Sequence, residues 1–129
     1  MKYLIDTDVI IDINKGIQPI MGQLSELSER GGEMFVSTFT FIEYYYGELG
    51  HGKERQALKF IDQFGLITLV QSSAKLYAEL AHKYQKKGKM VSTFDLLTSA
   101  IAIDSGCMLL TRDKGFEKIS ELNKIVLQA

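Results

Sequence analysis

Two carboxylates near the amino terminus are the first residues whose types and spacing suggest chemistry. Asp6 and Asp8 flank Thr7, directly after the short apolar run Tyr3-Leu4-Ile5. An apolar run that ends abruptly in carboxylates is typical of a buried strand at its carboxyl end, where open α/β sheets bind ligands. Neighbouring carboxylates repel each other, and their hard oxygens suit Mg²⁺ or Mn²⁺. The pattern therefore indicates either a divalent-cation site or an ordinary helix cap, which Asp also forms well.

Three further acids fit the cation interpretation. Asp113 comes just after the apolar run 107–111, much as Asp6 follows the first run. Asp95 falls in the first turn of an apolar helix, where the helix dipole favours the ionised carboxylate. Glu43 lies among apolar and aromatic residues, a costly position for a carboxylate unless it is paired or binds a metal. Each acid alone also fits a turn or helix start, and only their convergence on one sheet edge favours a shared metal site.

The elements that must position these acids alternate along the chain between strand and helix patterns. Such alternation is typical of parallel βαβ units, so we expect an α/β fold with a central, mostly parallel sheet of four to five strands. The expected strands are 3–5, 34–37, 66–70, 107–111 and 125–127, and the expected helices are 9–15, 20–30, 38–47, 54–64, 73–86, 94–105 and 116–119. The fifth helix is expected to be capped by Ser72 or Ser73. Helix 94–105 is apolar nearly all round and should be well buried.

Composition and charge exclude several classes of protein. The 129 residues are 46% apolar and 24% charged, which is typical of a globular chain, and we expect one domain over 1–129. No apolar stretch approaches the roughly 20 residues that span a bilayer. The net charge of −1 lacks the overall basic signature of a nucleic-acid binder, although a local basic rim remains compatible with it. The single cysteine, Cys107, and the absence of a signal sequence favour the cytoplasm.

The same residues carry a resemblance to a known family. The chain resembles PIN domains, specifically the short VapC-type toxins of toxin–antitoxin pairs, in Leu4-Ile5-Asp6-Thr7-Asp8-Val9, Ile42-Glu43, Asp95-Leu96-Leu97 and Leu110-Thr111-Arg112-Asp113. The resemblance implies a three-layer α/β/α fold and a metal-dependent endoribonuclease. It also implies a cognate antitoxin and a homodimer. Two residues depart from the family pattern, because Asp8 stands where Asn is common and Gly115 where a further acid often follows.

The resemblance also assigns roles to individual side chains. Asp6, Asp95 and Asp113 would hold Mg²⁺ or Mn²⁺, and Glu43 would share the coordination or orient the attacking water. Residues expected to contact these acids or the RNA phosphates are Thr7, Thr111, Arg112, Lys114, Lys86, Lys87 and Lys89. The lysine run 86–89 also fits a solvated helix end, where cations suit the helix dipole.

Two other functions remain compatible with the sequence. Asp6-Thr7-Asp8 also resembles the first motif of haloacid-dehalogenase-type phosphatases, a reading that leaves Glu43 without a role. A non-catalytic PIN-like module that binds RNA or protein is the second alternative, and Gly115 favours it weakly. The stretch 47–54 has the glycine and lysine spacing of a phosphate-binding loop, but Glu54 replaces the required Ser or Thr, and we interpret it as a turn.

Overall fold

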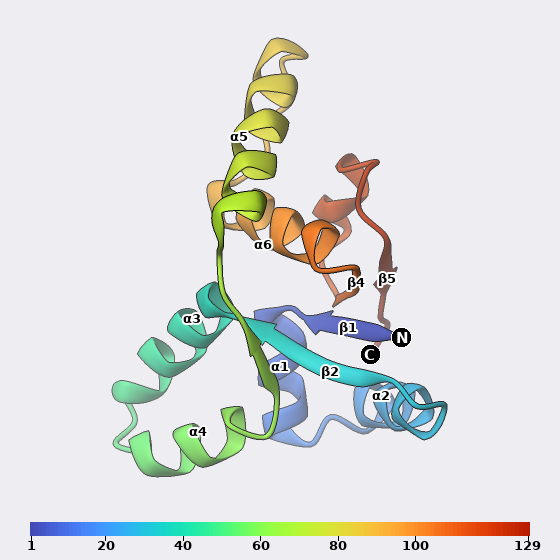
Figure 1. Cartoon of the computed structure of the whole chain (residues 1–129). Helices are drawn as coiled ribbons and strands as arrows, with labels where there is room; N and C mark the ends of the chain where they lie inside the picture. The colour runs from blue at the N-terminus through green and yellow to red at the C-terminus, as the bar shows by residue number, and fades with distance from the viewer.

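A five-stranded parallel sheet forms the centre of the computed structural model, which describes residues 1–129 (Figure 1). Its strands are β1 (Lys2–Ile5), β2 (Glu33–Ser37), β3 (Gly65–Ile67), β4 (Cys107–Thr111) and β5 (Lys124–Val126). They lie in the order β3-β2-β1-β4-β5, and every neighbouring pair is parallel. The predicted α/β fold with a parallel sheet is therefore confirmed.

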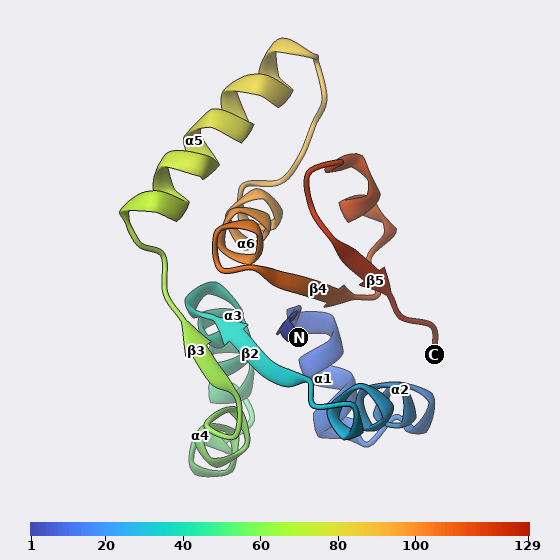
Figure 2. The same cartoon turned by 45° about the vertical axis from the view of Figure 1, so that its right-hand side comes forward.

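Helices cover both faces of the sheet and complete the predicted three layers. The helices on one face are α1 (Thr7–Lys15), α2 (Gln18–Glu29), α3 (Thr38–Leu49) and α4 (Glu54–Ile61) (Figure 2). The other face carries α5 (Gln71–Lys86), α6 (Thr93–Asp104) and the 3₁₀ helix η1 (Lys114–Lys118). Helix α6 is buried along most of its length, as its apolar sequence predicts.

Strand β1 shows how the sequence builds a separate core on each face. Successive side chains of a strand point to opposite faces, so Tyr3 and Ile5 pack under α1–α4 while Leu4 packs under α5 and α6. Ile5 and Leu4 are fully buried, and each such side chain contributes about 1.5–3 kcal/mol through its removal from water. The central strand is therefore fixed in place from both sides.

Several element boundaries differ from those predicted. Val70, not Ser72 or Ser73, precedes the first residue of α5, and the Ser73 hydroxyl accepts a hydrogen bond from the Val70 N–H at 2.9 Å. Ser73 therefore closes the first turn from inside the helix. Strand β3 ends at Ile67 because it lies at the sheet edge and pairs only with β2. Helix α4 ends at Ile61 because the chain must turn before Gly65 pairs with β2.

The register of β1 and β4 places the predicted site at one edge of the sheet. Ile5 lies opposite Leu110, and the Asp6 N–H donates to the Leu110 carbonyl at 2.9 Å. Asp6 and Asp113 therefore emerge from the carboxyl ends of adjacent strands, as the sequence predicts.

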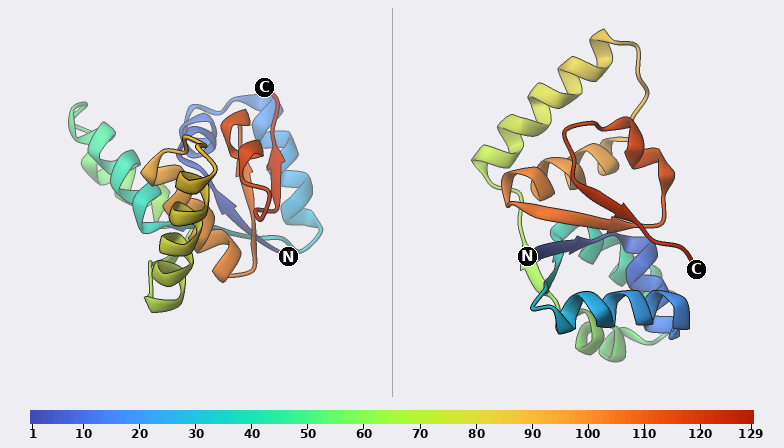
Figure 3. Two further views of the ribbon diagram at one scale, coloured as in Figure 1. Left: turned by 90° about the horizontal axis from the view of Figure 1, so that it is seen from above. Right: turned by 90° about the vertical axis from the view of Figure 1, so that its right-hand side faces the viewer.

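The carboxyl terminus lies beside α2, whereas α5 leans away from the sheet (Figure 3). The Gln23 amide donates both to the Gln128 carbonyl at 2.8 Å and to the Pro19 carbonyl at 2.7 Å, which ties the last residues to α2. None of the helices has the length and apolar character needed to cross a bilayer.

Candidate active site

Asp6 occupies the junction between β1 and α1. Its Oδ1 accepts the Thr7 N–H at 2.9 Å, and its Oδ2 accepts the Thr111 hydroxyl at 2.8 Å. Burial is the largest influence on this carboxyl, followed by the nearby charge of Asp8, and together they raise its pKa to about 7 against the opposing hydrogen bonds. Asp6 is therefore held in one orientation in surroundings that disfavour its negative charge.

Asp95 lies in the first turn of α6, where the sequence places it. Its N–H donates to the hydroxyl of Ser92, the residue that caps the helix, at 3.1 Å. Burial raises the pKa of Asp95, and the charges of Asp113 and Glu43 raise it further against the effect of the Ser92 hydrogen bond. The carboxyl of Asp95 therefore responds to the two acids that come from α3 and from the end of β4.

Glu43 differs from its prediction in one respect. It is exposed on α3, together with Ile42 and Tyr46, so the burial cost inferred from its apolar neighbours is wrong. The apolar residues around it in the sequence include some that also face outward. Glu43 Oε1 accepts the Thr7 hydroxyl at 2.8 Å, which links α3 to the start of α1.

An aromatic pair holds α3 and α6 together beside these acids. Phe39, one turn before Glu43, and Phe94, directly before Asp95, pack with their ring centroids 5.7 Å apart. Aromatic contacts of this kind stabilise neighbouring elements by about 0.5–1.5 kcal/mol beyond their buried area. The pair was missed in the sequence, where the only signal is its position next to the acids.

Asp113 begins a tight turn after β4. Its N–H donates to the Thr111 hydroxyl at 3.0 Å, and its Oδ1 accepts the Gly115 N–H at 2.8 Å. A Cβ added at Gly115 would lie 3.0 Å from the same Oδ1. Glycine at this position therefore leaves room for the Asp113 carboxylate, which a larger residue would displace.

The predicted basic residues are not gathered at this edge. Lys86 ends α5, and the loop with Lys87 and Lys89 follows it at the end of the molecule farthest from the sheet (Figure 1). Lys89 lies over the Tyr84 ring, 5.8 Å from its centroid. Lys114, by contrast, directly follows Asp113 and is exposed.

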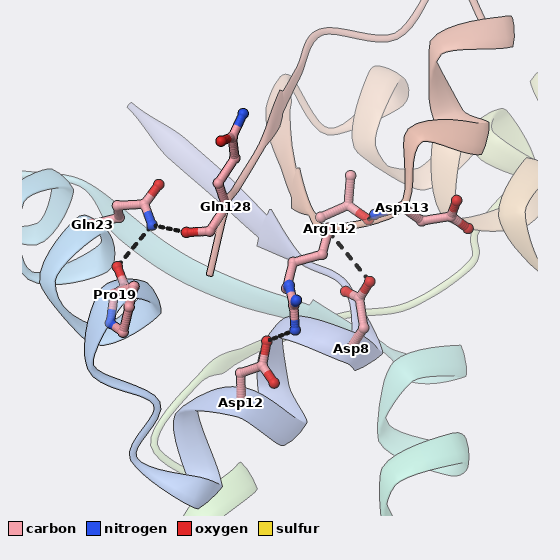
Figure 4. Close-up of polar contacts among 8 residues, drawn as sticks. Asp8, Asp12, Pro19, Gln23, Arg112, Asp113 and Gln128 are labelled. Atoms are coloured by element: carbon pink, nitrogen blue, oxygen red, sulfur yellow. Dashed lines mark hydrogen bonds and ion pairs between the residues drawn. The ribbon is translucent and has the colours of Figure 1, made fainter.

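Arg112 and two acids of α1 form a further polar group that sequence reasoning missed (Figure 4). The Arg112 guanidinium pairs with Asp12 at 2.8 Å, and the Arg112 N–H donates to Asp8 Oδ2 at 3.3 Å. The other oxygen of Asp8 is buried and has no hydrogen-bond partner. The sequence signal that could have found this group is Asp12 itself, an acid within the apolar run 9–13. An acid among apolar residues predicts a buried, paired carboxylate, and this holds for the buried Asp12 but not for the exposed Glu43.

We name Asp6, Glu43, Asp95 and Asp113 the acid cluster, and its donor set fits a divalent cation. All its potential ligands are carboxylate oxygens, which suit Mg²⁺ or Mn²⁺, and none of the four pairs with a basic side chain. Burial raises the pKa values of Asp6 and Asp95, and repulsion from neighbouring acids raises them further. In the conformation seen, no three acids are close enough together to enclose an ion, and Glu43 and Asp113 accept hydrogen bonds from Thr7 and Gly115.

Comparison with known proteins identifies the family. The PIN domain family model matches residues 3–122. The chain is 28% identical to Ribonuclease VapC2 of Haemophilus influenzae (strain Rd) over 127 residues, which covers 95% of each chain. It is 30% identical to Ribonuclease VapC3 of Methanocaldococcus jannaschii over 101 residues, which covers 78% of this chain and 98% of the relative.

Solved structures show the same fold. VapBC2 from Rickettsia felis, bound to a DNA fragment from its promoter, matches with a TM-score of 0.85 at 24% identity and covers 97% of this chain and 98% of its own. A toxin–antitoxin complex from Klebsiella pneumoniae matches with a TM-score of 0.78 at 22% identity and covers 95% of each chain. With a model that matches nearly the whole chain and relatives named VapC ribonucleases, the chain belongs to the PIN domain family.

Proposed function

We propose that this protein is a metal-dependent endoribonuclease and the toxin of a VapBC-type toxin–antitoxin pair. Asp6, Asp95 and Asp113 hold Mg²⁺ or Mn²⁺, and Glu43 shares the coordination or orients the attacking water. The observation that carries the proposal is the acid cluster: Asp95 acts electrostatically on Asp6 and is acted on by Asp113 and Glu43, and none of the four acids pairs with a basic side chain. The similarity to proteins named ribonucleases supports RNA as the substrate.

The chain's own residues prepare the acids for this task. The Thr111 hydroxyl holds Asp6, and the Thr7 hydroxyl holds Glu43, so both carboxylates are oriented before substrate arrives. Hydrogen bonds that orient metal ligands are a common feature of such sites. A bound cation supplies positive charge against the charge that develops on the phosphoryl oxygens and lowers the pKa of water. In this proposal the acids bind the divalent cation on which cleavage depends.

RNA and protein partners belong to the same proposal. Exposed Lys114 is the basic residue best placed to contact a phosphate beside Asp113, whereas Lys86, Lys87 and Lys89 would meet only a longer RNA. Ile42 and Phe94 are about half exposed near Glu43 and Asp95, and apolar surface at such a place suits an antitoxin that covers the acids. The exposed Tyr46 on α3 suits the homodimer that we also propose, because Tyr is enriched at interfaces.

The test is cleavage of a structured RNA pool by the purified protein with Mg²⁺, with Mn²⁺ and with EDTA. We expect cleavage that needs the metal and is lost in Asp6→Asn. Asp62→Asn, a matched substitution at the exposed end of α4, should cleave as the wild type does. RNA binding without cleavage under any metal would favour the non-catalytic module, and metal-independent cleavage would refute the assignment of the acid cluster.

A further inference from the structure

Arg112 makes two contacts that both lead back to α1 (Figure 4). Its guanidinium Nη1 donates to Asp12 Oδ2 at 2.8 Å, and its main-chain N–H donates to Asp8 Oδ2 at 3.3 Å. Asp8 and Asp12 are four residues apart, so they lie on the same side of the helix. One face of α1 therefore holds both the main chain and the side chain of a residue 100 positions away. We name Asp8, Asp12 and Arg112 the Arg112 clamp.

The ion pair of the clamp is more sheltered than the surface pairs of the molecule. The Asp12 side chain is 12% exposed and the Arg112 side chain 39%. The corresponding values for Arg30 and Glu26, a pair within α2 and its end, are 72% and 64%. Removing one partner from a sheltered pair leaves the other charge without compensation, so the clamp is expected to resist opening more than an exposed pair does.

The clamp lies at the point where it can control Asp113. Arg112 directly follows Thr111, whose hydroxyl bonds to Asp6, and directly precedes Asp113. Apart from β4 and η1, which continue the chain on either side, α1 is the one element that forms hydrogen bonds with residues 112–115. The place of the Asp113 main chain therefore depends on how Arg112 is held, while the Asp113 carboxylate accepts the Gly115 N–H.

We propose that Asp8 and Asp12 are positioning residues, which hold Arg112 against α1 and thereby fix the main chain of Asp113 at the end of β4 for cation binding. This inference rests on the proposed function. It gives Arg112 a structural role toward the metal that uses one of the five N–H donors of its guanidinium, a role separate from the phosphate contact expected from the sequence. A cation with strict geometric demands, such as Mg²⁺, binds best to carboxylates that are already oriented.

The experiment measures Mn²⁺ binding to the RNA-free protein by calorimetry, with circular dichroism to verify the fold. Arg112→Ala and Asp12→Ala should each weaken Mn²⁺ binding by about 10- to 100-fold, the usual effect of removing a partner that orients a ligand. The double variant should bind no more weakly than either single variant, because all three remove the same contact. Arg112→Lys should recover part of the affinity.

Two matched controls accompany these variants. Arg30→Ala removes an arginine from an exposed ion pair and should leave Mn²⁺ binding unchanged. Asp8→Asn and Asp8→Ala both remove the charge of Asp8, but only Asp8→Asn retains a carbonyl oxygen that can accept the Arg112 N–H, so it should weaken binding less than Asp8→Ala does. Asp12→Asn, which preserves shape, replaces Asp12→Ala if the alanine variant fails to fold.

The outcomes separate the clamp from its alternatives. Unchanged Mn²⁺ affinity in Arg112→Ala, together with a higher KM for RNA, would assign Arg112 to phosphate binding and overturn the clamp. Additive losses in the double variant would overturn it as well. Wild-type protein that binds Mn²⁺ but cleaves no RNA would refute the proposed nuclease, while the Mn²⁺ comparison among variants would still decide the clamp.

Discussion

Two carboxylates, Asp6 and Glu121, respond to their surroundings in opposite ways. Burial disfavours the charge of Glu121, but hydrogen bonds from Lys83 and Tyr84 outweigh it and lower its pKa to about 2. Burial also disfavours the charge of Asp6, and its most influential neighbour is a second acid, Asp8, so its pKa rises to about 7. Glu121 pairs with a basic side chain of the protein, Lys83, whereas Asp6 has no basic partner.

The opposite pKa shifts of Asp6 and Glu121 indicate different roles for the acid cluster and for the Glu121 pair. Lys83 and Tyr84 come from α5, so the Glu121 pair joins that helix to the segment between η1 and β5 and stabilises the fold. The acid cluster offers hydrogen-bonded carboxylates without a basic partner, an arrangement that a bound cation would stabilise. The Arg112 clamp links the two kinds of site. Asp12 on α1 is paired with Arg112, and in the proposed role this pair positions Asp113, an acid of the cluster that has no basic partner.

The largest expected difference between the two regions is in RNA cleavage. Asp6→Asn should reduce the cleavage rate by on the order of 10³-fold, because a bound metal contributes several kcal/mol to catalysis. Glu121→Gln should leave the rate within about twofold, since Glu121 lies outside the acid cluster. Rates measured under single-turnover conditions with saturating Mn²⁺ test both expectations. Equal losses in the two variants would refute the division of roles.

The dependence of stability on pH should also separate the regions. Asp6 has a pKa of about 7 in the folded protein and roughly 4 in the unfolded chain, so the folded state binds more protons between these values. The free energy of unfolding of metal-free protein should therefore fall as pH rises from 4 to 7, by roughly 2–3 kcal/mol after allowance for partial exposure.

Urea denaturation at several pH values in EDTA measures this fall. Asp6→Asn should make the fall over that range smaller and leave the part that comes from the raised pKa values of Asp8 and Asp95, and saturating Mg²⁺ should restore stability near pH 7 by binding the folded state. An identical fall in wild type and Asp6→Asn would show that Asp6 is not responsible for it.

A smaller effect is expected when Asp6 loses its orienting hydrogen bond. Thr111→Val removes the hydroxyl that donates to Asp6 Oδ2 and accepts the Asp113 N–H. Metal affinity should weaken by about tenfold, at the lower end of the range for such partners. Calorimetric titration with Mn²⁺ tests this. The matched control is Thr98→Val, which replaces a buried threonine that lies on α6 and not on β4. Equal affinities in the two variants would contradict the orienting role of Thr111.

Much of this architecture could be predicted because local patterns determine it. The apolar runs of β1 and β4 predict buried strands, and their parallel pairing predicts that Asp6 and Asp113 share an edge; both features are present. The short β3 and the boundary of α5 could not be predicted, because they depend on which partner strand lies alongside and on whether Ser73 bonds forward or back.

The contacts of the site could be predicted less well than its location. The apolar sequence around Glu43 predicts burial, but the exposure of a helix face depends on what packs against it, and Glu43 faces outward. The pairing of Asp12 with Arg112 joins residues 100 positions apart, so no local pattern contains it. Which side chains meet across the fold is decided by how the elements pack, and the periodicity of a single segment does not contain that information.

The smallest expected effect concerns the paired carboxylate. Glu121→Gln keeps an oxygen acceptor for the Tyr84 hydroxyl but loses the charge that attracts Lys83, so the free energy of unfolding should fall by about 1 kcal/mol at pH 7, with screening by solvent included. Because the pKa of Glu121 is lowered to about 2, its contribution is present above its usual pKa and is lost as pH falls through the acid range. The difference in the free energy of unfolding between wild type and Glu121→Gln should therefore shrink from pH 4.5 toward pH 2, opposite in sign to the effect of Asp6.

The matched control is Glu79→Gln, in an exposed pair with Lys75, which should change the free energy of unfolding by no more than about 0.5 kcal/mol. A difference for Glu121→Gln that stays constant from pH 7 to pH 2 would show that packing, not charge, is what Glu121 contributes.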